Sequence, residues 1–274
     1  MLAPTVLTIA GFEPSGGAGV IADIRTLAAF GCTPTAAVTS LTFQNAQAIQ
    51  GARHQAAETV RAQVLAIVAE SPIAAAKTGM LPTSEIVREV ARLFREEELP
   101  APVVDPVLRS TSGYELMEAD AIEVLLVELM PLARVITPNI PEAETLTGLR
   151  IEDEKGMRAA ASRLREMGAR AVLIKGGHLK QRPAVGGQKA EGRRQKAEKA
   201  GATLQAIDVL DNEGRVTVFR GEWIDSPPVR GTGCMLSAAI AACLAKGKDL
   251  EEAIRLGKRF VTDEIRRASE LRVR

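Results

Sequence analysis

An apolar, alanine-rich run follows a glycine turn near the carboxyl end of the sequence. The turn comprises Arg230 to Cys234, and no charged side chain occurs between Met235 and Ala242. A helix that is apolar on every side must be buried. The run therefore predicts a helix packed inside the protein, which requires other elements to cover it.

The glycine turn itself predicts an anion site at the start of this helix. Gly231, Thr232 and Gly233 leave backbone N–H groups pointing at one spot, at the positive end of the helix dipole. Such an arrangement binds an anion, most often a phosphate. The alternative is a plain loop in which Thr232 caps the helix. Cys234 would lie on the first turn, where the same field lowers the pKa of a thiol.

Composition excludes several other classes of protein. The chain has 274 residues, 46% of them apolar and 25% charged, as in an ordinary globular protein. The net charge of +1 favours neither nucleic acid nor an anionic membrane as a partner. Three cysteines, Cys32, Cys234 and Cys243, cannot form a disulfide framework and suit a reducing cytoplasm. We expect no secretory signal at the N-terminus and no membrane-spanning segment.

Short apolar runs alternate with amphipathic segments along the chain. The predicted strands are residues 5–10, 35–41, 73–78, 103–104, 135–137, 171–175, 204–210 and 215–220. The helices are predicted at 20–28, 58–69, 84–97, 120–132, 153–168, from Pro141, after the glycine turn and from Asp249. This alternation predicts one α/β domain over residues 1–274, with a mostly parallel sheet, helices on both faces and an antiparallel hairpin near the C-terminal part.

Several predicted strands end in polar or glycine-rich turns. These ends contain Gly11 and the glycine loop after it, Gln44, Asp105, Asn139 with Glu142, and Lys175. The carboxyl ends of parallel strands share one edge, where ligands bind in open α/β sheets. An anion-binding helix start, a lysine and two carboxylates at that edge suit a nucleoside triphosphate with magnesium.

Three residues near these strand ends, Asp23, Gln44 and Met80, each have a functional and an ordinary structural interpretation. Asp23 points back to the glycine loop or is a solvated helix carboxylate. Gln44 donates and accepts hydrogen bonds at the edge of a heterocycle, or it closes a turn. Met80 lines a pocket or fills the core. The glycine loop does not match the Gly-x-Gly-x-x-Gly fingerprint of dinucleotide sites.

The segment from residue 181 to 200 differs from the rest. It is rich in lysine and arginine and has almost no large apolar side chain, which predicts a basic, flexible surface excursion. Because it lacks aromatic residues, a solvated loop is favoured over a nucleic-acid site.

Taken in order, these motifs resemble the hydroxymethylpyrimidine/phosphomethylpyrimidine kinases of thiamine biosynthesis, in the ribokinase-like superfamily. The matching stretches are residues 8–11, 14–19, 22–23, 44–45, 77–80, 105–107, 137–144, 175–178 and 231–234. Together they cover nearly the whole chain. The resemblance implies a ribokinase-like fold and ATP-dependent phosphorylation of 4-amino-5-hydroxymethyl-2-methylpyrimidine and then of its monophosphate.

The resemblance also implies roles for individual residues. Gly231, Thr232 and Gly233 would form the anion hole for the transferred phosphoryl group, and Cys234 would activate the substrate hydroxyl. The implied pyrimidine-binding residues are Gly11, Asp23, Gln44, Met80 and Val107. The implied nucleotide-binding residues are Lys175, Asn139 and Arg230. Glu142, with Asp105 nearby, would hold Mg²⁺, and a homodimer is expected.

The sequence departs from the family pattern at several positions near these motifs. Phe12-Glu13 stand where the family usually has Ser-Asp, and Ile21 replaces a glutamine. A family lysine falls on Thr111, and Arg230 replaces a histidine; Arg230 could supply the missing positive charge. Two alternatives stay open: a pyridoxal or pyridoxine kinase on the same fold, and a pyrimidine-binding module that has lost catalysis.

Overall fold

The computed structural model describes residues 3–45, 48–97, 99–110, 113–177, 205–224, 226 and 229–270. The predicted excursion at 181–200 and Thr111 lie outside these residues. The strands are β1 Thr5–Phe12, β2 Thr33–Gln44, β3 Ile49–His54, β4 Ile73–Thr78, β5 Val103–Val104, β6 Val135–Ile136, β7 Ala171–Lys175, β8 Gln205–Asn212 and β9 Arg215–Glu222. The helices are α1 Gly19–Ala29, α2 Ala57–Glu70, α3 Ser84–Glu96, α4 Ala119–Val124, α5 Ile140–Thr147, α6 Glu154–Glu166, α8 Thr232–Ala245 and α9 Leu250–Glu270.

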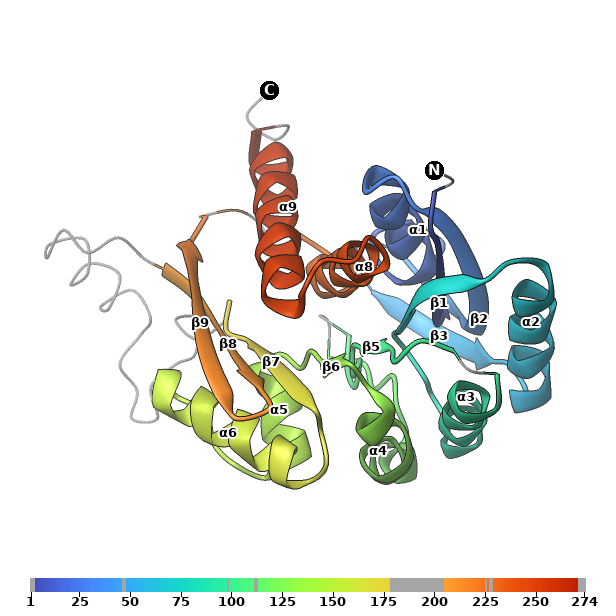
Figure 1. Ribbon diagram of the computed structural model, residues 1–274, viewed down its shortest axis with the longest axis horizontal. Coiled ribbons are helices and arrows are strands. Elements are labelled where there is room, and N and C mark those ends of the chain that lie inside the picture. The colour runs from blue at the N-terminus through green and yellow to red at the C-terminus, as the bar shows by residue number, and fades with distance from the viewer. Residues whose placement is uncertain are drawn as a thin grey trace, which may run out of the picture.

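The described strands form one sheet in the order β3-β2-β1-β4-β5-β6-β7-β8-β9. The six central strands, β2, β1, β4, β5, β6 and β7, are parallel to one another. At one edge β3 pairs antiparallel with β2, and at the other edge β8 and β9 continue the sheet in antiparallel pairs. Helices α1, α8 and α9 cover one face, and α2 to α6 cover the other (Figure 1). The mostly parallel α/β sheet and its antiparallel β8–β9 hairpin confirm the fold predicted from the sequence.

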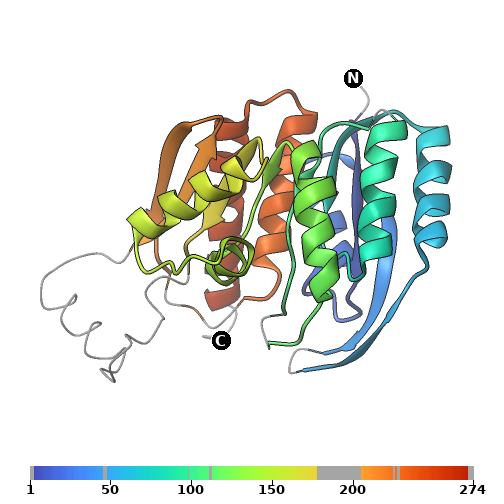
Figure 2. The ribbon, with the colours of Figure 1, turned by 90° about the horizontal axis from the view of Figure 1, so that it is seen from below.

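Two elements differ from the sequence expectation. Strand β2 is longer than predicted and pairs with β3, which the sequence did not indicate because residues 49–54 have no apolar alternation. The β2–β3 hairpin extends beyond the body of the sheet (Figure 2). The predicted helix at 120–132 is divided into α4, a π-helical turn at Leu125–Leu129 and a 3-10 turn at Met130–Leu132. Pro131 cannot donate an N–H to a continuous helix.

Helix α8 lies in the core, as its apolar sequence predicts. Every residue from Leu236 to Cys243 is buried. Beneath it, Val6, Ala75, Val103, Val135 and Leu173 form one apolar cluster with the residues of α8 and α9. A separate cluster fills the other face of the sheet under α3 and α6. Successive side chains of a strand point to opposite faces, so each strand supplies both clusters.

Among the described helices, none combines the length and the apolar character that a membrane crossing requires.

Candidate active site

A row of polar side chains lies at the carboxyl ends of the central strands, on the face that α8 covers. Each polar residue comes two positions after an apolar residue of the cluster under α8. The pairs are Ala75 and Lys77, Val103 and Asp105, Val135 and Thr137, and Leu173 and Lys175. The period of two places all four polar side chains on the same face as those apolar residues. The apolar residues of these strands support the body of α8, and the polar residues that follow them lie where α8 begins.

The N-terminus of α8 has no side-chain cap. Its N-cap residue is Gly231, in the left-handed region at φ 73°, and Thr232 is already the first residue of the helix. The alternative in which Thr232 caps the helix is therefore wrong. The N–H groups of Thr232, Gly233 and Cys234 precede the first helical hydrogen bond, from Met235 N to Gly231 O at 2.8 Å. Uncapped N–H groups at a helix start are suited to binding an anion.

The first glycine loop already holds an anionic side chain. The Glu13 carboxylate accepts hydrogen bonds from Ser15 N at 2.8 Å, Gly17 N at 2.6 Å and Ala18 N at 3.1 Å. Burial opposes ionisation of Glu13. Hydrogen bonds from the Ser15 hydroxyl, at 2.6 Å, and from the Ser15 and Gly17 amides, together with the charge of Arg230, outweigh burial and lower the pKa of Glu13. The amides of this loop are therefore used internally, which leaves the α8 start as the better anion site.

Arg230 connects the two glycine turns. Its guanidinium donates to Ser15 Oγ at 3.0 Å and lies 3.6 Å from Glu13 Oε1. Its side chain is one quarter exposed. The role of Arg230 in binding nucleotide stays a prediction, but its contacts hold the loop after β1 against the turn before α8.

Asp105 and Lys175 form an ion pair beneath the start of α8. Lys175 Nζ donates to Asp105 Oδ1 at 2.8 Å, and Thr137 Oγ1 donates to the same oxygen at 3.2 Å. Ser237 Oγ donates to Asp105 Oδ2 at 3.4 Å. Burial alone would raise the pKa of Asp105, but the nearby Lys175 and Lys77 lower it, so this carboxylate is charged at neutral pH.

Lys175 also faces the glycine turn directly. A Cβ added at Gly233 would lie 3.2 Å from Lys175 Nζ and 3.7 Å from Asp105 Oδ2. The ammonium group and the first amides of α8 therefore border the same space. Both are donors that suit phosphate oxygens.

Asn139 and Glu142 form a capping box at the start of α5. Asn139 Oδ1 accepts from Glu142 N at 2.9 Å, and Glu142 Oε2 accepts from Asn139 N at 2.7 Å. Glu142 Oε2 also lies 4.0 Å from Lys175 Nζ. Burial, assisted by the charge of Asp105, raises the pKa of Glu142 to about 7. Glu142 is therefore close to its titration point at neutral pH.

The donor set of Asp105 and Glu142 is compatible with magnesium. Both carboxylates lie within 4.0 Å of Lys175 Nζ, and oxygen atoms are the ligands that Mg²⁺ prefers. In the described part of the chain, no group of three or more His, Cys, Asp or Glu side chains could hold a metal. Any magnesium here would need further oxygen ligands from phosphate groups and water, as is usual for Mg²⁺ with nucleotides.

Cys234 does not have the lowered pKa expected from its position on the first turn of α8. It is partly buried, and burial raises the pKa of its thiol to about 11. Lys77 and the Gly19 amide lower this pKa, whereas the carboxylates of Asp23 and Asp105 raise it. The expectation was wrong because it counted only the helix field and left out burial and the two carboxylates.

Asp23 lies in a buried ion pair and is not solvated. Lys77 Nζ donates to Asp23 Oδ2 at 2.7 Å, and Thr8 Oγ1 donates to the same oxygen at 2.7 Å. Both side chains of the ion pair are 0% exposed. The solvated alternative for Asp23 is therefore wrong, and contact between Asp23 and a pyrimidine stays a prediction.

Gly11 and Met80 lie side by side, and Met80 is buried. Contact of either residue with a pyrimidine stays a prediction. A Cβ on Gly11 would lie 2.8 Å from Met80 Sδ. Val107 is partly buried in the loop after Asp105, and Gln44 is partly buried at the end of β2. The turn after β2 is closed by Asn45, whose side chain accepts from Ala48 N at 3.0 Å.

The sequence did not assign roles to several polar residues of this site. Lys77, Thr137, Ser237 and Glu13 are buried or nearly buried, and each contacts a predicted site residue. A lysine inside the apolar run of β4 was the clearest available signal, because lysine is almost never fully buried unless it is paired. Thr137 and Ser237 have no comparable signal in the sequence.

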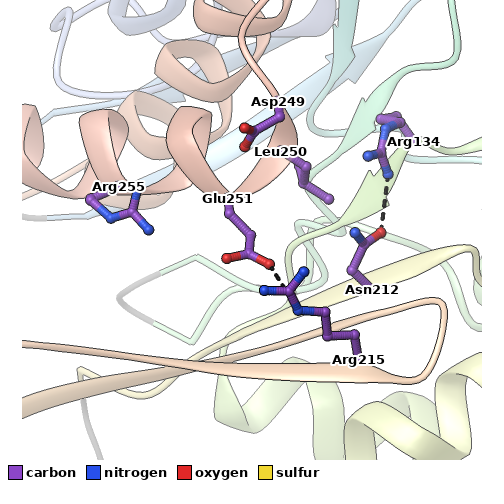
Figure 3. Close-up of a pocket in the computed structure, with 7 residues that line it drawn as sticks. All are labelled: Arg134, Asn212, Arg215, Asp249, Leu250, Glu251 and Arg255. Atoms are coloured by element: carbon purple, nitrogen blue, oxygen red, sulfur yellow. Dashed lines mark hydrogen bonds and ion pairs between the residues drawn. The ribbon is translucent and has the colours of Figure 1, made fainter.

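A separate pocket of about 410 Å³ lies at the opposite edge of the sheet. It is lined by Arg134, Asn212, Arg215, Asp249, Leu250, Glu251 and Arg255, near the start of α9 (Figure 3). Arg215 there pairs with Glu251, and Arg134 with Asn212. None of the predicted site residues lines this pocket, so it is not the candidate active site.

The fold and the site together define a phosphotransferase. A mostly parallel sheet carries an uncapped glycine helix start, a lysine and two carboxylates at one edge, and phosphoryl transfer requires mainly positioning and charge neutralisation. Residues 13–273 match the model of the phosphomethylpyrimidine kinase family, and the chain belongs to this family.

Two relatives named as kinases of this family, and one structure of a pyridoxal kinase, are similar to the chain. The chain is 38% identical to the hydroxymethylpyrimidine/phosphomethylpyrimidine kinase of Streptomyces coelicolor, covering 96% of this chain and 88% of that protein. The structure of phosphomethylpyrimidine kinase from Clostridium difficile is similar, with a TM-score of 0.77, 33% identity and coverage of 96% and 99%. The ADP complex of Bacillus subtilis pyridoxal kinase has a TM-score of 0.79, with 33% identity and coverage of 95% and 90%.

Proposed function

We propose that the protein phosphorylates 4-amino-5-hydroxymethyl-2-methylpyrimidine, and then its monophosphate, with ATP as the phosphoryl donor in thiamine biosynthesis. The observation that carries this proposal is the uncapped start of α8 above the Asp105–Lys175 pair. Family membership specifies the chemistry, and this edge of the sheet supplies the charge that the chemistry needs. That a similar kinase structure holds ADP supports ATP as the co-substrate.

In this proposal the phosphoryl group is transferred beside the glycine turn. The amides of Thr232 and Gly233 and the ammonium of Lys175 would stabilise the negative charge on the transferred group. Cys234, in its thiolate form, would accept the proton of the substrate hydroxyl while the hydroxyl oxygen bonds to the γ-phosphorus of ATP. The bond from that phosphorus to the bridging oxygen breaks, and ADP leaves. Because the thiol pKa is about 11, only a small fraction of the protein holds that thiolate at neutral pH.

Asp105 and Glu142 are the residues that would hold Mg²⁺ in this proposal. Bound magnesium supplies charge neutralisation on the nucleotide phosphates. Lys175 lies between the two carboxylates, so it keeps their mutual repulsion small. Since Glu142 titrates near neutral pH, its carboxylate form becomes available as the pH rises through 7.

The pyrimidine would lie between the loop after β1 and the ends of β2 and β4. Gly11 is packed against Met80 there, because even a methyl group on Gly11 would collide with Met80 Sδ. Gln44 would supply a donor and an acceptor to the aminopyrimidine edge. Asn139 and Arg230 would lie nearer to the nucleotide.

Product analysis tests this function directly. The purified protein is supplied with ATP and Mg²⁺, and with either the pyrimidine alcohol or its monophosphate, and products are identified by mass spectrometry. Monophosphate from the first substrate and diphosphate from the second are expected. Absence of turnover on both, with thermal stabilisation by the pyrimidine, would instead indicate a binding module.

Pyridoxal phosphorylation is the second candidate, favoured by the similarity to pyridoxal kinase. The two rings present different edge groups to Gln44. Comparing kcat/KM for the pyrimidine alcohol and for pyridoxal distinguishes these functions, and we expect a higher value for the pyrimidine.

We further propose that the protein acts as a homodimer in the cytoplasm. Leu41 and Phe43 are 40% and 52% exposed. They are two positions apart on β2 and so lie on one face of the strand, which supports an apolar contact surface there. The cysteines Cys32, Cys234 and Cys243 are all free, as in a reducing compartment. Light scattering of the wild type and of Phe43→Asp tests the dimer; a monomer in both would contradict it.

A further inference from the structure

The pocket at the start of α9 is distinct from the candidate active site. Arg134, which lines it, precedes β6, whereas Thr137 of the candidate active site follows that strand, so the two sites lie at opposite ends of β6. The other side chains that line the pocket come from the β8–β9 turn and from the start of α9 (Figure 3). These segments are far apart in the sequence, so the pocket forms only in the folded protein.

The lining of this pocket is almost entirely polar. Its volume of about 410 Å³ is enough for a small molecule. Of the seven described residues that line it, six are polar or charged, and the one apolar residue, Leu250, is buried. Three arginines accompany two carboxylates, so the lining has one positive charge in excess. The pocket therefore suits a polar anion better than an apolar or aromatic ligand.

Arg134 is a half-buried guanidinium without a counter-ion in the described part of the chain. Its hydrogen bond to Asn212 Oδ1 is long, at 3.4 Å, and most of its five N–H donors have no acceptor among these residues. The nearby Glu213 carboxylate is bound by Arg170 at 2.7 Å. The other described arginines that form no ion pair are exposed to water. Burial and the charge of Arg170 lower the pKa of Arg134, which is the effect of an uncompensated charge.

The other charged side chains of the pocket are only partly engaged. Arg255 is exposed and forms no ion pair with the described residues, and Arg215 lies 3.6 Å from Glu251 Oε1. One oxygen of Asp249 accepts from Glu252 N at 2.8 Å and so caps α9. The second oxygen of Asp249 and that of Glu251 receive no hydrogen bond from the residues that the structure describes. Free donors and free acceptors therefore border the same space.

We propose that this pocket is a second ligand site, which binds a small phosphorylated compound that carries hydroxyl groups, such as a sugar phosphate. Arg134 and Arg255 bind its phosphate, because guanidinium groups match phosphate oxygens in geometry and charge. Asp249 and Glu251 accept hydrogen bonds from its hydroxyl groups. The site lies away from the glycine turn before α8, so this inference does not depend on the proposed function.

Calorimetric titration of the full-length protein tests the site, at constant low ionic strength. The probes are ribose 5-phosphate, inorganic phosphate and ribose. We expect saturable binding of ribose 5-phosphate, weaker binding of inorganic phosphate and no binding of ribose. Equal affinity for ribose 5-phosphate and inorganic phosphate would overturn the assignment of a sugar phosphate, because the hydroxyl groups would then contribute nothing.

Two substitutions locate the binding. Arg134→Gln keeps a donor for Asn212 but removes the charge, and should weaken the binding of ribose 5-phosphate by about tenfold or more. Arg255→Gln should also weaken it, and this change lies at an exposed position where it does not disturb packing. Arg25→Gln on α1 is the matched control, because Arg25 is exposed, has no ion pair in the described residues and does not line the pocket. It removes the same charge and should leave the affinity unchanged.

Lys175→Met separates this site from the candidate active site. It removes the ammonium group beside the glycine turn and should leave the binding of ribose 5-phosphate unchanged, whereas kcat and KM of Arg134→Gln should equal those of the wild type. Binding that survives both Arg134→Gln and Arg255→Gln would overturn the proposal, as would loss in Lys175→Met or equal loss in Arg25→Gln. If the wild type binds the probe as expected but phosphorylates neither pyrimidine nor pyridoxal, the proposed function fails and the second site stands.

Discussion

Gly231 packs against Gly17 so closely that a Cβ on Gly231 would lie 2.1 Å from the Gly17 carbonyl oxygen. Gly231 precedes α8 and Gly17 lies in the loop after β1, so residues from the two ends of the chain meet at this point. Arg230 and Glu13 reinforce the contact beside it. The close approach brings Cys234 to the Gly19 amide at the start of α1.

This contact predicts a large effect of Gly231→Ala. The substitution would force the loop after β1 away from α8 and would also place alanine at φ 73°, so both stability and turnover should fall. Gly247 is a matched control, because it has φ 76° but no atom within 4 Å of an added Cβ. Gly247→Ala should cost only about 1 kcal/mol of stability and leave kcat unchanged. Thermal melts and steady-state kinetics of both variants check this, and equal effects would contradict it.

Cys234→Ser should reduce kcat by about 10²- to 10⁴-fold, because the proton acceptor is lost. Pyrimidine affinity, measured calorimetrically, should stay nearly the same, since the thiol acts on the transition state. The wild-type kcat should increase with pH above 7, as the thiolate fraction grows toward a pKa of about 11. A serine variant with the same pH dependence and a similar kcat would rule out this role for Cys234.

Lys175→Met should lower kcat by about 10²-fold or more, because the charge beside the first amides of α8 disappears. The variant also removes the main positive charge that lowers the pKa of Asp105. Lys248→Met is the control, since Lys248 pairs with Glu252 on the surface, where such pairs contribute little. Steady-state kinetics of both variants checks the prediction. A similar small loss in the two variants would show that Lys175 has no special role.

The sequence predicted most of the parallel sheet because each central strand is a short apolar run between clear helix and turn signals. It also identified the strand ends that meet at the site. Strand β3, which the sequence did not predict, has no alternation of apolar and polar residues. It forms because its backbone pairs with the edge of β2. The ion pair of Asp23 with Lys77 and the raised pKa of Cys234 depend on burial between α1, α8 and β4, and a linear motif contains no measure of burial.

Glu142 should make the stability of the ligand-free protein depend on pH. Its pKa is about 7 in the folded protein and near 4.5 when unfolded, so the folded state binds more protons between these values. This contribution is fully present below pH 4.5 and is lost as the pH rises through 7, in total about 3 kcal/mol. Glu142→Gln keeps an acceptor for Asn139 N in the capping box, as Gln does in such boxes.

At pH 8 without Mg²⁺, Glu142→Gln should therefore melt at a higher temperature than wild type, and at pH 4.5 the difference should vanish. Mg²⁺ with a non-hydrolysable ATP analogue should reverse the order at pH 8, because binding favours the carboxylate of Glu142 and the amide cannot replace its charge. Calorimetric scans at the two pH values, with and without the metal and nucleotide, check both parts. A constant difference across pH would show that Glu142 does not titrate in this range. An unchanged order with Mg²⁺ and nucleotide would remove Glu142 from the proposed magnesium site.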